Sequence, residues 1–462
     1  MSPPTQIAVD ELRFRLGGGL HEPGTPDYED ACTLFNAAID TRPGWVARCP
    51  APDDVIAALA FARKHDLEVA VRAGGHSVAG LSLRHDGLVL DVRGMDDVDV
   101  DPERRIVRVG GGATWAQVDR ATAAHGLATT GGRVSTTGVA GLTLGGGSGW
   151  LERLHGLACD NLVAVELVTA DGRLVRASED ESPELLWALR GGGGNFGVAC
   201  ALELRLHPLP AEVLGGLVLH PAERGRELLA LWRDVMEDAP EELSLAFAFI
   251  TAPDEEDVPE ELRNRPAAIV VGMYAGPLAE GEAALARIRA FGPPAADFFG
   301  ATAYADFQCS IDDPPGYRNW WTAENVHHLP DEAIDRLAER AADMVPGPAQ
   351  IFLVAWGGAV TRFGPETSPI TGRDARFIVH PLLLWEDPAD DERMMALGRR
   401  VREDLRAHAT GGAYLNFLGD EGHRLRSVFG PNYERLARVK AEWDPDNVFR
   451  GNLNLRPAMA AA

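Results

Sequence analysis

The stretch "VRAGGHSVAG", residues 71–80, places one histidine among glycines directly after an apolar, alternating run. Glycine lets the main chain take positive φ angles and approach a ligand closely, so this turn is typical of a backbone surface against which a large molecule lies. His76 is the reactive side chain of the turn. The stretch therefore indicates a binding loop.

The sequence around this loop predicts two α+β units. Residues 51–68 have apolar side chains at helical spacing with acids in the first turn, and the run into the loop follows as a strand. Thr114 and Gln117 stand at the spacing of a helix capping box, and Asp171-Gly172 forms the two-residue turn of a predicted hairpin. Each unit thus delivers strands into glycine-rich turns.

From about residue 209 the glycine clusters thin out and a second pattern begins. Helical spacing over 224–238 is followed by strand patterns over 242–251, 266–276 and 377–385, with more helices between them. This half of the chain predicts a sheet that helices cover on one face.

Charge and length restrict the class of protein. The 462 residues favour two or three domains, and 44 basic against 69 acidic side chains give a net charge of −25, which argues against nucleic acid and anionic membrane partners. No secretory signal pattern and no membrane-length apolar run occurs, so we expect a soluble, cytoplasmic protein. The five cysteines are scattered without CxxC spacing, which predicts neither a disulfide framework nor a metal site.

Further glycine clusters lie at 109–115, 129–150 and 190–198. Stacked N–H groups in such turns bind phosphate oxygens, so a dinucleotide is expected. Gly192, Gly194 and Gly197 match G-x-G-x-x-G, but a nicotinamide-binding motif must open a helix, and a strand pattern follows here. A nicotinamide dehydrogenase is the weaker alternative, which requires a helix after this cluster.

His76 has two interpretations. It could be a turn histidine that bonds to a backbone carbonyl, or a neutral imidazole that attacks the ring methyl group of a flavin and tethers it. The glycine clusters around it favour the tether.

Six motifs together resemble the berberine bridge enzyme-like group of the vanillyl alcohol oxidase/p-cresol methylhydroxylase superfamily of FAD-linked oxidases. They are "VRAGGHSVAG", "GGRVSTTGVAGLTLGGGSGW", "GLACDNLVAVELVTADG", "LWALRGGGGNFGV", "GGAYLNF" and "WDPDNVFRGNLNL", in the family's order over nearly the whole chain. The resemblance implies an α+β fold with a two-part FAD-binding domain of the p-cresol methylhydroxylase type over 1–208. It also implies a substrate domain with a helix-covered antiparallel sheet over 209–440, and a segment over 441–462 that returns to the FAD domain.

The resemblance also implies the cofactor contacts. His76 is the expected 8α-histidyl attachment site. The other expected FAD-binding residues are Arg72, Ala73, Gly74, Gly75, Ser77, Val134, Thr137, Gly138, Gly141, Gly145, Gly147, Gly194, Val198 and Asn416. Val134 stands where many members carry a second, cysteine tether, so a single covalent bond is expected, and Cys159 is expected to be a small buried thiol. Thr137 takes the family's oxygen-gate position, and its small β-branched shape favours reaction with O₂.

Tyr414 and His380 are the candidate catalytic bases. Tyr414 and Asn416 would share one face if their segment is a strand, and Tyr414 matches the family tyrosine that points at the flavin. His380 lies on an apolar strand, where it could equally be structural. Arg318, Trp320 and Trp321 could be pocket walls or surface packing.

The expected function is an FAD oxidase that removes hydride from a C–OH or C–N bond of a small organic substrate and passes electrons to O₂, giving H₂O₂. Sugars, secondary alcohols, alkaloid-like and polyketide-like molecules stay open as substrates, and a monomer or homodimer is expected. An FAD dehydrogenase of the same fold that uses another electron acceptor, or a non-catalytic flavin-binding protein, are the alternatives.

Overall fold

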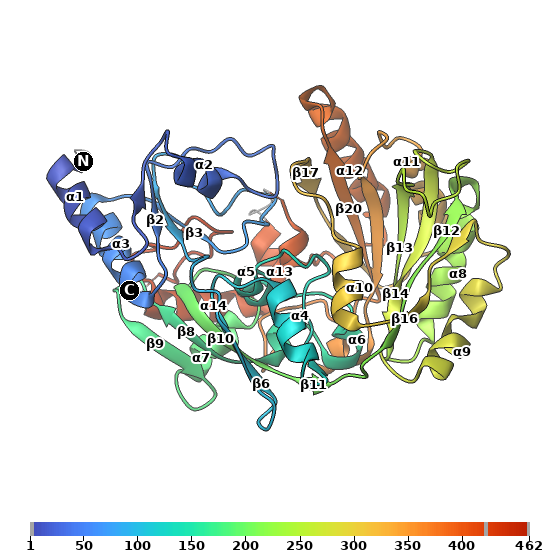
Figure 1. The fold of residues 1–462 in the computed structure, drawn as a ribbon, viewed down its shortest axis with the longest axis horizontal. Helices are drawn as coiled ribbons and strands as arrows, with labels where there is room; N and C mark the ends of the chain where they lie inside the picture. Colours follow the sequence, from blue (N-terminus) through green and yellow to red (C-terminus); the bar gives the residue numbers. More distant parts are fainter. Residues whose placement is uncertain (1–3, 420–423, 460–462) are drawn as a thin grey trace.

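The computed structural model describes residues 4–419 and 424–459 and confirms the predicted α+β class. Two smaller sheets lie on one side of the molecule and a nine-stranded sheet on the other (Figure 1). No helix in these residues is long and apolar enough to cross a membrane.

The first sheet carries the 71–80 loop. Its order is β1 (Leu20–His21), β2 (Trp45–Arg48), β4 (Leu88–Asp91) and β3 (Val69–Arg72). Helix α3 (Pro52–His65) packs on it through Val55, Leu59 and their neighbours, and Asp66 in the left-handed region ends that helix. α1 (Gln6–Arg15) packs beside α3, and α2 (Pro26–Cys32) covers the other face with Tyr28. The chain leaves β3 directly into the glycine loop, as the sequence predicts.

The second sheet is antiparallel and holds the other glycine clusters at its ends. Its order is β5 (Val98–Asp101), β6 (Ile106–Gly110), β10 (Val198–Arg205), β8 (Leu162–Val168) and β9 (Leu174–Ser178). The helices with it are α4 (Trp115–Ala123), α5 (Val139–Leu144) and α7 (Pro183–Leu189), whereas α6 (Glu152–His155) lies against β13 (Leu243–Thr251) of the nine-stranded sheet. The Thr114 cap is confirmed, because its N–H donates to Gln117 Oε1 at 2.8 Å. A strand, β10, and no helix follows the 190–197 cluster, which removes the nicotinamide alternative.

The nine-stranded sheet is covered on one face by helices, as predicted (Figure 1). Its strands are β12 (Val213–Pro221), β13 (Leu243–Thr251), β14 (Pro266–Tyr274), β15 (Ala296–Asp297), β16 (Gly300–Thr302), β17 (Arg318–Trp321), β18 (Glu324–Val326), β19 (Gln350–Ala355) and β20 (Phe377–Trp385). The covering helices are α8 (Gly225–Glu237), α9 (Leu278–Arg289), α11 (Asp331–Ala341) and α12 (Asp391–Leu405). Strand side chains alternate, so that Phe247 and Leu353 pack under the helices while Ala246 and Phe352 face away from them.

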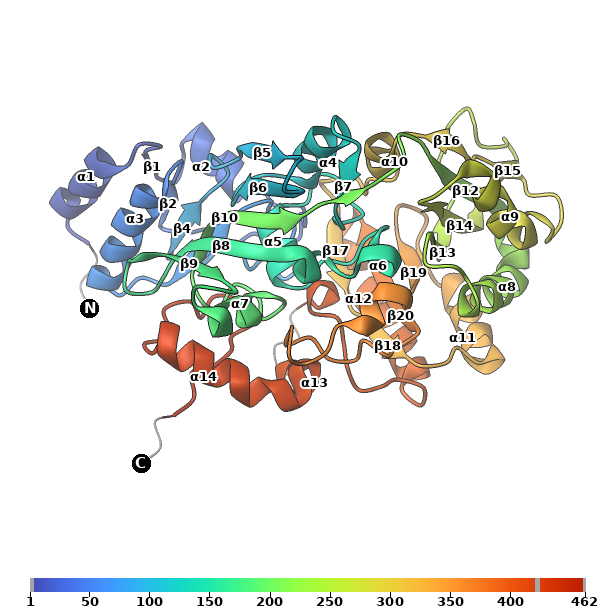
Figure 2. The ribbon, with the colours of Figure 1, turned by 90° about the horizontal axis from the view of Figure 1, so that it is seen from below.

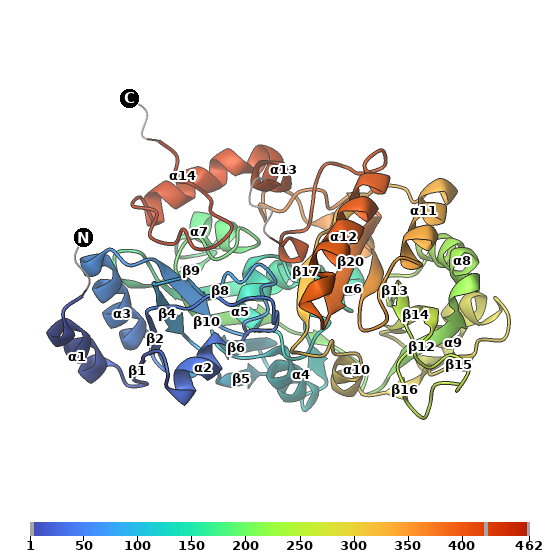
Figure 3. The ribbon, with the colours of Figure 1, turned by 90° about the horizontal axis from the view of Figure 1, so that it is seen from above.

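The C-terminal return to the first half begins earlier than the predicted residue 441. Helix α14 (Tyr433–Trp443), which follows α13 (Leu425–Phe429), lies beside α7 and away from the large sheet, as Figures 2 and 3 show. Phe429, Leu436 and Val439 pack into the same core as Trp187. The return starts before residue 441 because these apolar helix faces are buried against the first half of the chain.

Candidate active site

A cavity of about 750 Å³ lies between the two halves of the molecule. The loops around residues 73–78, 133–145 and 193–199 form one wall, and the uncovered face of the large sheet forms the other. Such a volume is typical of a site for a small molecule or cofactor. The predicted site residues that line it are Ala73, Gly74, Gly75, His76, Ser77, Val134, Thr137, Gly138, Gly141, Gly145, Gly194, His380 and Asn416.

Two glycine loops meet backbone to backbone in the first wall. A Cβ on Gly74 would lie 2.2 Å from the Gly138 nitrogen, and a Cβ on Gly138 would lie 2.5 Å from the Gly74 nitrogen. No real Cβ approaches another atom so closely, so glycine is required at both positions. This contact brings His76 beside Thr136 and Thr137, whose Oγ1 atoms lie 3.1 Å from His76 Nε2 and 3.4 Å from Nδ1.

His76 is held as a neutral imidazole. Burial lowers the pKa of the ring to about 4, because the charged form would lose its hydration. The ring also stacks on Phe35, with centroids 4.5 Å apart. A neutral ring nitrogen keeps the lone pair that a nucleophile needs.

Three predicted cofactor residues do not line the cavity in the described part of the chain. The Arg72 guanidinium turns away and donates to the carbonyls of Asp30 and Thr33, so it fixes α2 against the loop. Gly147 packs against Ala158, and Val198 is fully buried in a core cluster. Cys159 is buried as expected, and burial raises the pKa of its thiol.

Tyr414 also lies outside the cavity wall, and its segment is not the strand on which Tyr414 and Asn416 would share one face. Residues Leu415–Phe417 form a 3₁₀ turn, which folds Asn416 back so that its Nδ2 donates to the Tyr414 hydroxyl at 3.1 Å. The same hydroxyl accepts the N–H groups of Gly147 and Ser148. Burial raises the pKa of Tyr414, so its phenolate form is disfavoured.

His380 lies on β20 and faces the cavity. Its Nδ1 lies 2.8 Å from the Thr322 carbonyl oxygen, and a carbonyl only accepts, so Nδ1 carries the proton and Nε2 keeps its lone pair. Within the described residues Nε2 has no hydrogen-bond partner although the side chain is buried. Burial lowers the pKa of His380 to about 4, and Phe417 stacks on its ring at 4.1 Å.

The sequence left open whether the side chains of β17 line a pocket or pack elsewhere, and the structure shows both arrangements. Arg318 makes a two-pronged ion pair with Asp391, and Trp320 packs toward the covering helices. Trp321 instead lines the cavity and meets His380 edge to face at 5.4 Å.

Several cavity residues escaped the sequence analysis. Arg133 lies in a quoted glycine motif, and Asn452, which donates to the Gly194 carbonyl, lies in the "GNLNL" motif. Asp313 and Gln350 also line the wall but carry no motif. Their proximity arises only when the large sheet forms.

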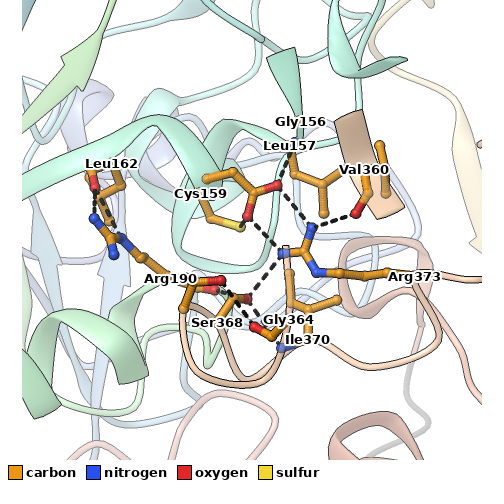
Figure 4. Close-up of polar contacts among 12 residues, drawn as sticks. Gly156, Leu157, Cys159, Leu162, Arg190, Val360, Gly364, Ser368, Ile370 and Arg373 are labelled. Atoms are coloured by element: carbon orange, nitrogen blue, oxygen red, sulfur yellow. Dashed lines mark hydrogen bonds and ion pairs between the residues drawn. The ribbon is translucent and has the colours of Figure 1, made fainter. Parts of the chain in front are cut away.

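A buried polar cluster around Arg373 lies next to the start of the 190–198 glycine cluster (Figure 4). Arg373 donates to both oxygens of Asp160, at 2.9 and 2.7 Å, and also to Ser368 Oγ at 3.1 Å. The Ser368 hydroxyl donates to the carbonyl of Arg190 at 2.7 Å. The cluster therefore joins the segment that carries Ser368 and Arg373 to Asp160, which follows the 129–150 glycine cluster, and to Arg190, which begins the 190–198 cluster.

Two family models match this chain, one in its first half and one in the C-terminal segment that returns to that half. A family model described as an FAD binding domain matches residues 43–178, and one described as berberine and berberine like matches residues 413–456. The (R)-6-hydroxynicotine oxidase of Paenarthrobacter nicotinovorans is 32% identical over 463 residues, covering 96% of this chain and 97% of that protein. An FAD-linked oxidoreductase of Bacillus subtilis is 28% identical over 455 residues, covering 96% and 98%.

Solved structures agree. The crystal structure of 6-hydroxy-D-nicotine oxidase from Arthrobacter nicotinovorans superposes with a TM-score of 0.86 at 28% identity, covering 96% of this chain and 98% of that one. A BBE-like protein from Physcomitrella patens has the same fold, with a TM-score of 0.87 at 21% identity, covering 98% and 100%.

Proposed function

Because the chain belongs to the berberine bridge enzyme-like family of FAD-linked oxidoreductases, we propose that it is an oxidase with FAD bonded to His76 alone. Its substrate is a small organic molecule with an oxidisable C–OH or C–N bond, and O₂ accepts the electrons to give H₂O₂. The observation that carries the proposal is a pair of neutral imidazoles, His76 and His380, on opposite walls of one cavity.

The cavity residues fit FAD. The first wall is bare main chain at Gly74 and Gly138, and a Cβ on Gly141 would meet no protein atom within 4 Å. Gly75 and Ser77 would hold the pyrophosphate, Gly138 and Gly141 the ring and ribityl chain. When bound, FAD supplies a hydride acceptor at flavin N5.

His76 supplies the nitrogen for the bond to the 8α carbon. Its low pKa keeps it unprotonated at neutral pH, and the two threonine hydroxyls fix the ring against Phe35. Val134 offers no thiol for a second bond.

His380 is the base that takes the substrate proton. Its Nε2 is unprotonated and has no partner among the residues that the structure describes, and the Nδ1 contact to the Thr322 carbonyl fixes that tautomer. Tyr414 serves instead to hold the loop at Gly147 and Ser148, because its oxygen already accepts their N–H groups.

Intact mass spectrometry of the denatured protein tests the tether. We expect a mass increase of one FAD in the natural protein and none in His76→Ala. An unmodified mass in a yellow protein would refute the covalent bond, and an unmodified, colourless protein would refute the flavin assignment.

The rate of flavin reduction tests the base. A screen that reads peroxide from cyclic amines, secondary alcohols and sugars, beginning with (R)-6-hydroxynicotine, supplies the substrate. His380→Gln should slow flavin reduction by about 100- to 10,000-fold while FAD stays bound. In the natural protein this rate should fall only as the pH drops toward about 4, where Nε2 becomes protonated.

Tyr414→Phe is the matched control. It removes the oxygen that two buried N–H groups use, so it should cost about 1–3 kcal/mol of stability. Its reduction rate should stay within roughly tenfold of the natural protein. Equal losses in both variants would contradict the assignment of His380.

A further inference from the structure

An acid and an amide stand together at the substrate end of the cavity. Asp313 follows α10 (Tyr304–Ser310) in the chain, and Gln350 is the first residue of β19. Gln350 Nε2 donates to Asp313 Oδ1 at 2.9 Å, and both side chains line the cavity. The amide therefore fixes the carboxylate and leaves its second oxygen for a ligand.

The neighbouring acid has a different task. Both oxygens of Asp312 accept from Ser135, one from its N–H and one from its hydroxyl, each at 2.5 Å. Asp312 thus ties the loop to the glycine wall and places Asp313 in position. Burial raises the pKa of Asp313 to about 7, with Asp312 adding to the rise, so an added cation nearby would stabilise its charged form.

No unpaired arginine or lysine among the described lining residues neutralises Asp313. Among the described lining residues Arg133 is the one arginine or lysine, and its guanidinium pairs at 2.7 Å with Glu152, which is fully buried. His76 and His380 are neutral because burial lowers the pKa of both. The site accordingly favours a positively charged ligand over an anion.

His380 gives an independent sign of a ligand in the same cavity, because its buried Nε2 lacks a partner among the described residues. In the register of β19 and β20, Phe352 stands opposite His380 and Gln350 opposite Leu382. Gln350 is two residues from Phe352 on the same face, so its backbone lies roughly 7 Å along the strand from that of Phe352. Between the two polar points the wall is apolar, formed by Phe352, Leu382 and their neighbours.

We propose that Asp313 and Gln350 recognise a protonated amine, so that the substrates are compact amines with an apolar, ring-bearing body. The ammonium group donates to Asp313, and the apolar body lies along the sheet and carries the oxidisable C–OH or C–N bond to His380. This inference rests on the proposed function and narrows its substrate class from sugars, alcohols and amines to cationic amines.

Calorimetric titration of the flavin-loaded protein with two probes of the same shape tests the proposal. The probes are 2-phenylpyrrolidine, which is protonated at neutral pH, and 2-phenyltetrahydrofuran, which is neutral. The amine should bind the natural protein more tightly than the ether. Asp313→Asn, which keeps the shape and the Gln350 contact, should weaken amine binding by roughly 10- to 100-fold and leave the ether unchanged.

Asp306→Asn is the matched control, because Asp306 is exposed on α10 outside the cavity and its loss changes the net charge equally. It should bind the amine as the natural protein does. Equal binding of the two probes, or a loss below about twofold in Asp313→Asn, would overturn the proposal. The FAD mass increase and the reoxidation of dithionite-reduced enzyme by O₂ do not depend on Asp313, so failure of the proposed function shows separately in those measurements.

Discussion

The two walls of the cavity are built on opposite principles. The loop wall at Gly74 and Gly138 is main chain against main chain, with no room for a side chain. The sheet wall projects large side chains, such as His380, Phe352 and Gln350, from a regular register. The loop wall therefore determines whether a cofactor can be held, and the sheet wall determines what lies against it.

The backbone contact in the loop wall tolerates no side chain, whereas the side chains of the sheet wall can change on a fixed backbone. A strand side chain can change without moving its backbone, because the register is held by main-chain hydrogen bonds. A loop glycine at a backbone contact has no such freedom. Substitutions at the contact glycines of the loop wall should consequently impair folding, whereas substitutions on the sheet wall should change the choice of substrate.

Gly74→Ala should have the largest effect. The new Cβ would lie 2.2 Å from the Gly138 nitrogen, so the two loops must separate and FAD should not be retained. Flavin absorbance per protein and soluble yield measure the effect. Gly300→Ala is the matched control, because Gly300 lies on β16 outside the cavity lining and its Cβ would meet no neighbouring atom within 4 Å. Full FAD content in Gly74→Ala would break the contrast between the walls.

Arg373→Met should have the next largest effect, since it leaves the buried Asp160 charge unpaired behind the loop wall (Figure 4). Breaking a buried pair costs about 3–5 kcal/mol, which denaturant unfolding would measure. Arg362→Met, which removes an exposed ion pair with Glu241, should cost less than about 1 kcal/mol. Similar losses in both variants would show that the buried cluster does not support the wall.

Thr137→Leu should have the smallest effect and leave the fold intact. Its Oγ1 lies 3.4 Å from His76 Nδ1, so a bulkier side chain would fill cavity space beside His76 and hinder the approach of O₂. Reoxidation in an oxygen-mixing experiment should slow by roughly tenfold, about 1.4 kcal/mol of barrier. Thr137→Val, of nearly the same shape, should react as the natural protein does. An unchanged rate in Thr137→Leu would refute the oxygen gate.

The sequence predicted the loop wall well and the rest of the site less well. Gly74, Gly138 and His76 were found because glycine clusters report backbone constraints that are local in sequence. Tyr414 and Asn416 would share one face only on a strand, yet a 3₁₀ turn follows Tyr414 and its hydroxyl accepts the N–H groups of Gly147 and Ser148. A two-residue spacing alone does not distinguish these two conformations.

Arg72 shows the same limit on a charged side chain. The family resemblance implied that Arg72 binds the cofactor as part of the loop that it begins. In the fold it bonds to the carbonyls of Asp30 and Thr33, about 40 positions earlier in the chain. The direction of a long side chain depends on partners that sequence proximity does not reveal.

Periodicity and backbone constraints within short segments predicted the two α+β units, the helix-covered sheet and the role of the histidine among glycines, and six sequence motifs carried the resemblance to the family. The tertiary structure was needed to show that His380 Nε2 has no hydrogen-bond partner among the described residues and that Asp313 meets Gln350. Both depend on strand register and loop packing between distant segments, and desolvation by the assembled walls then sets the pKa of each group.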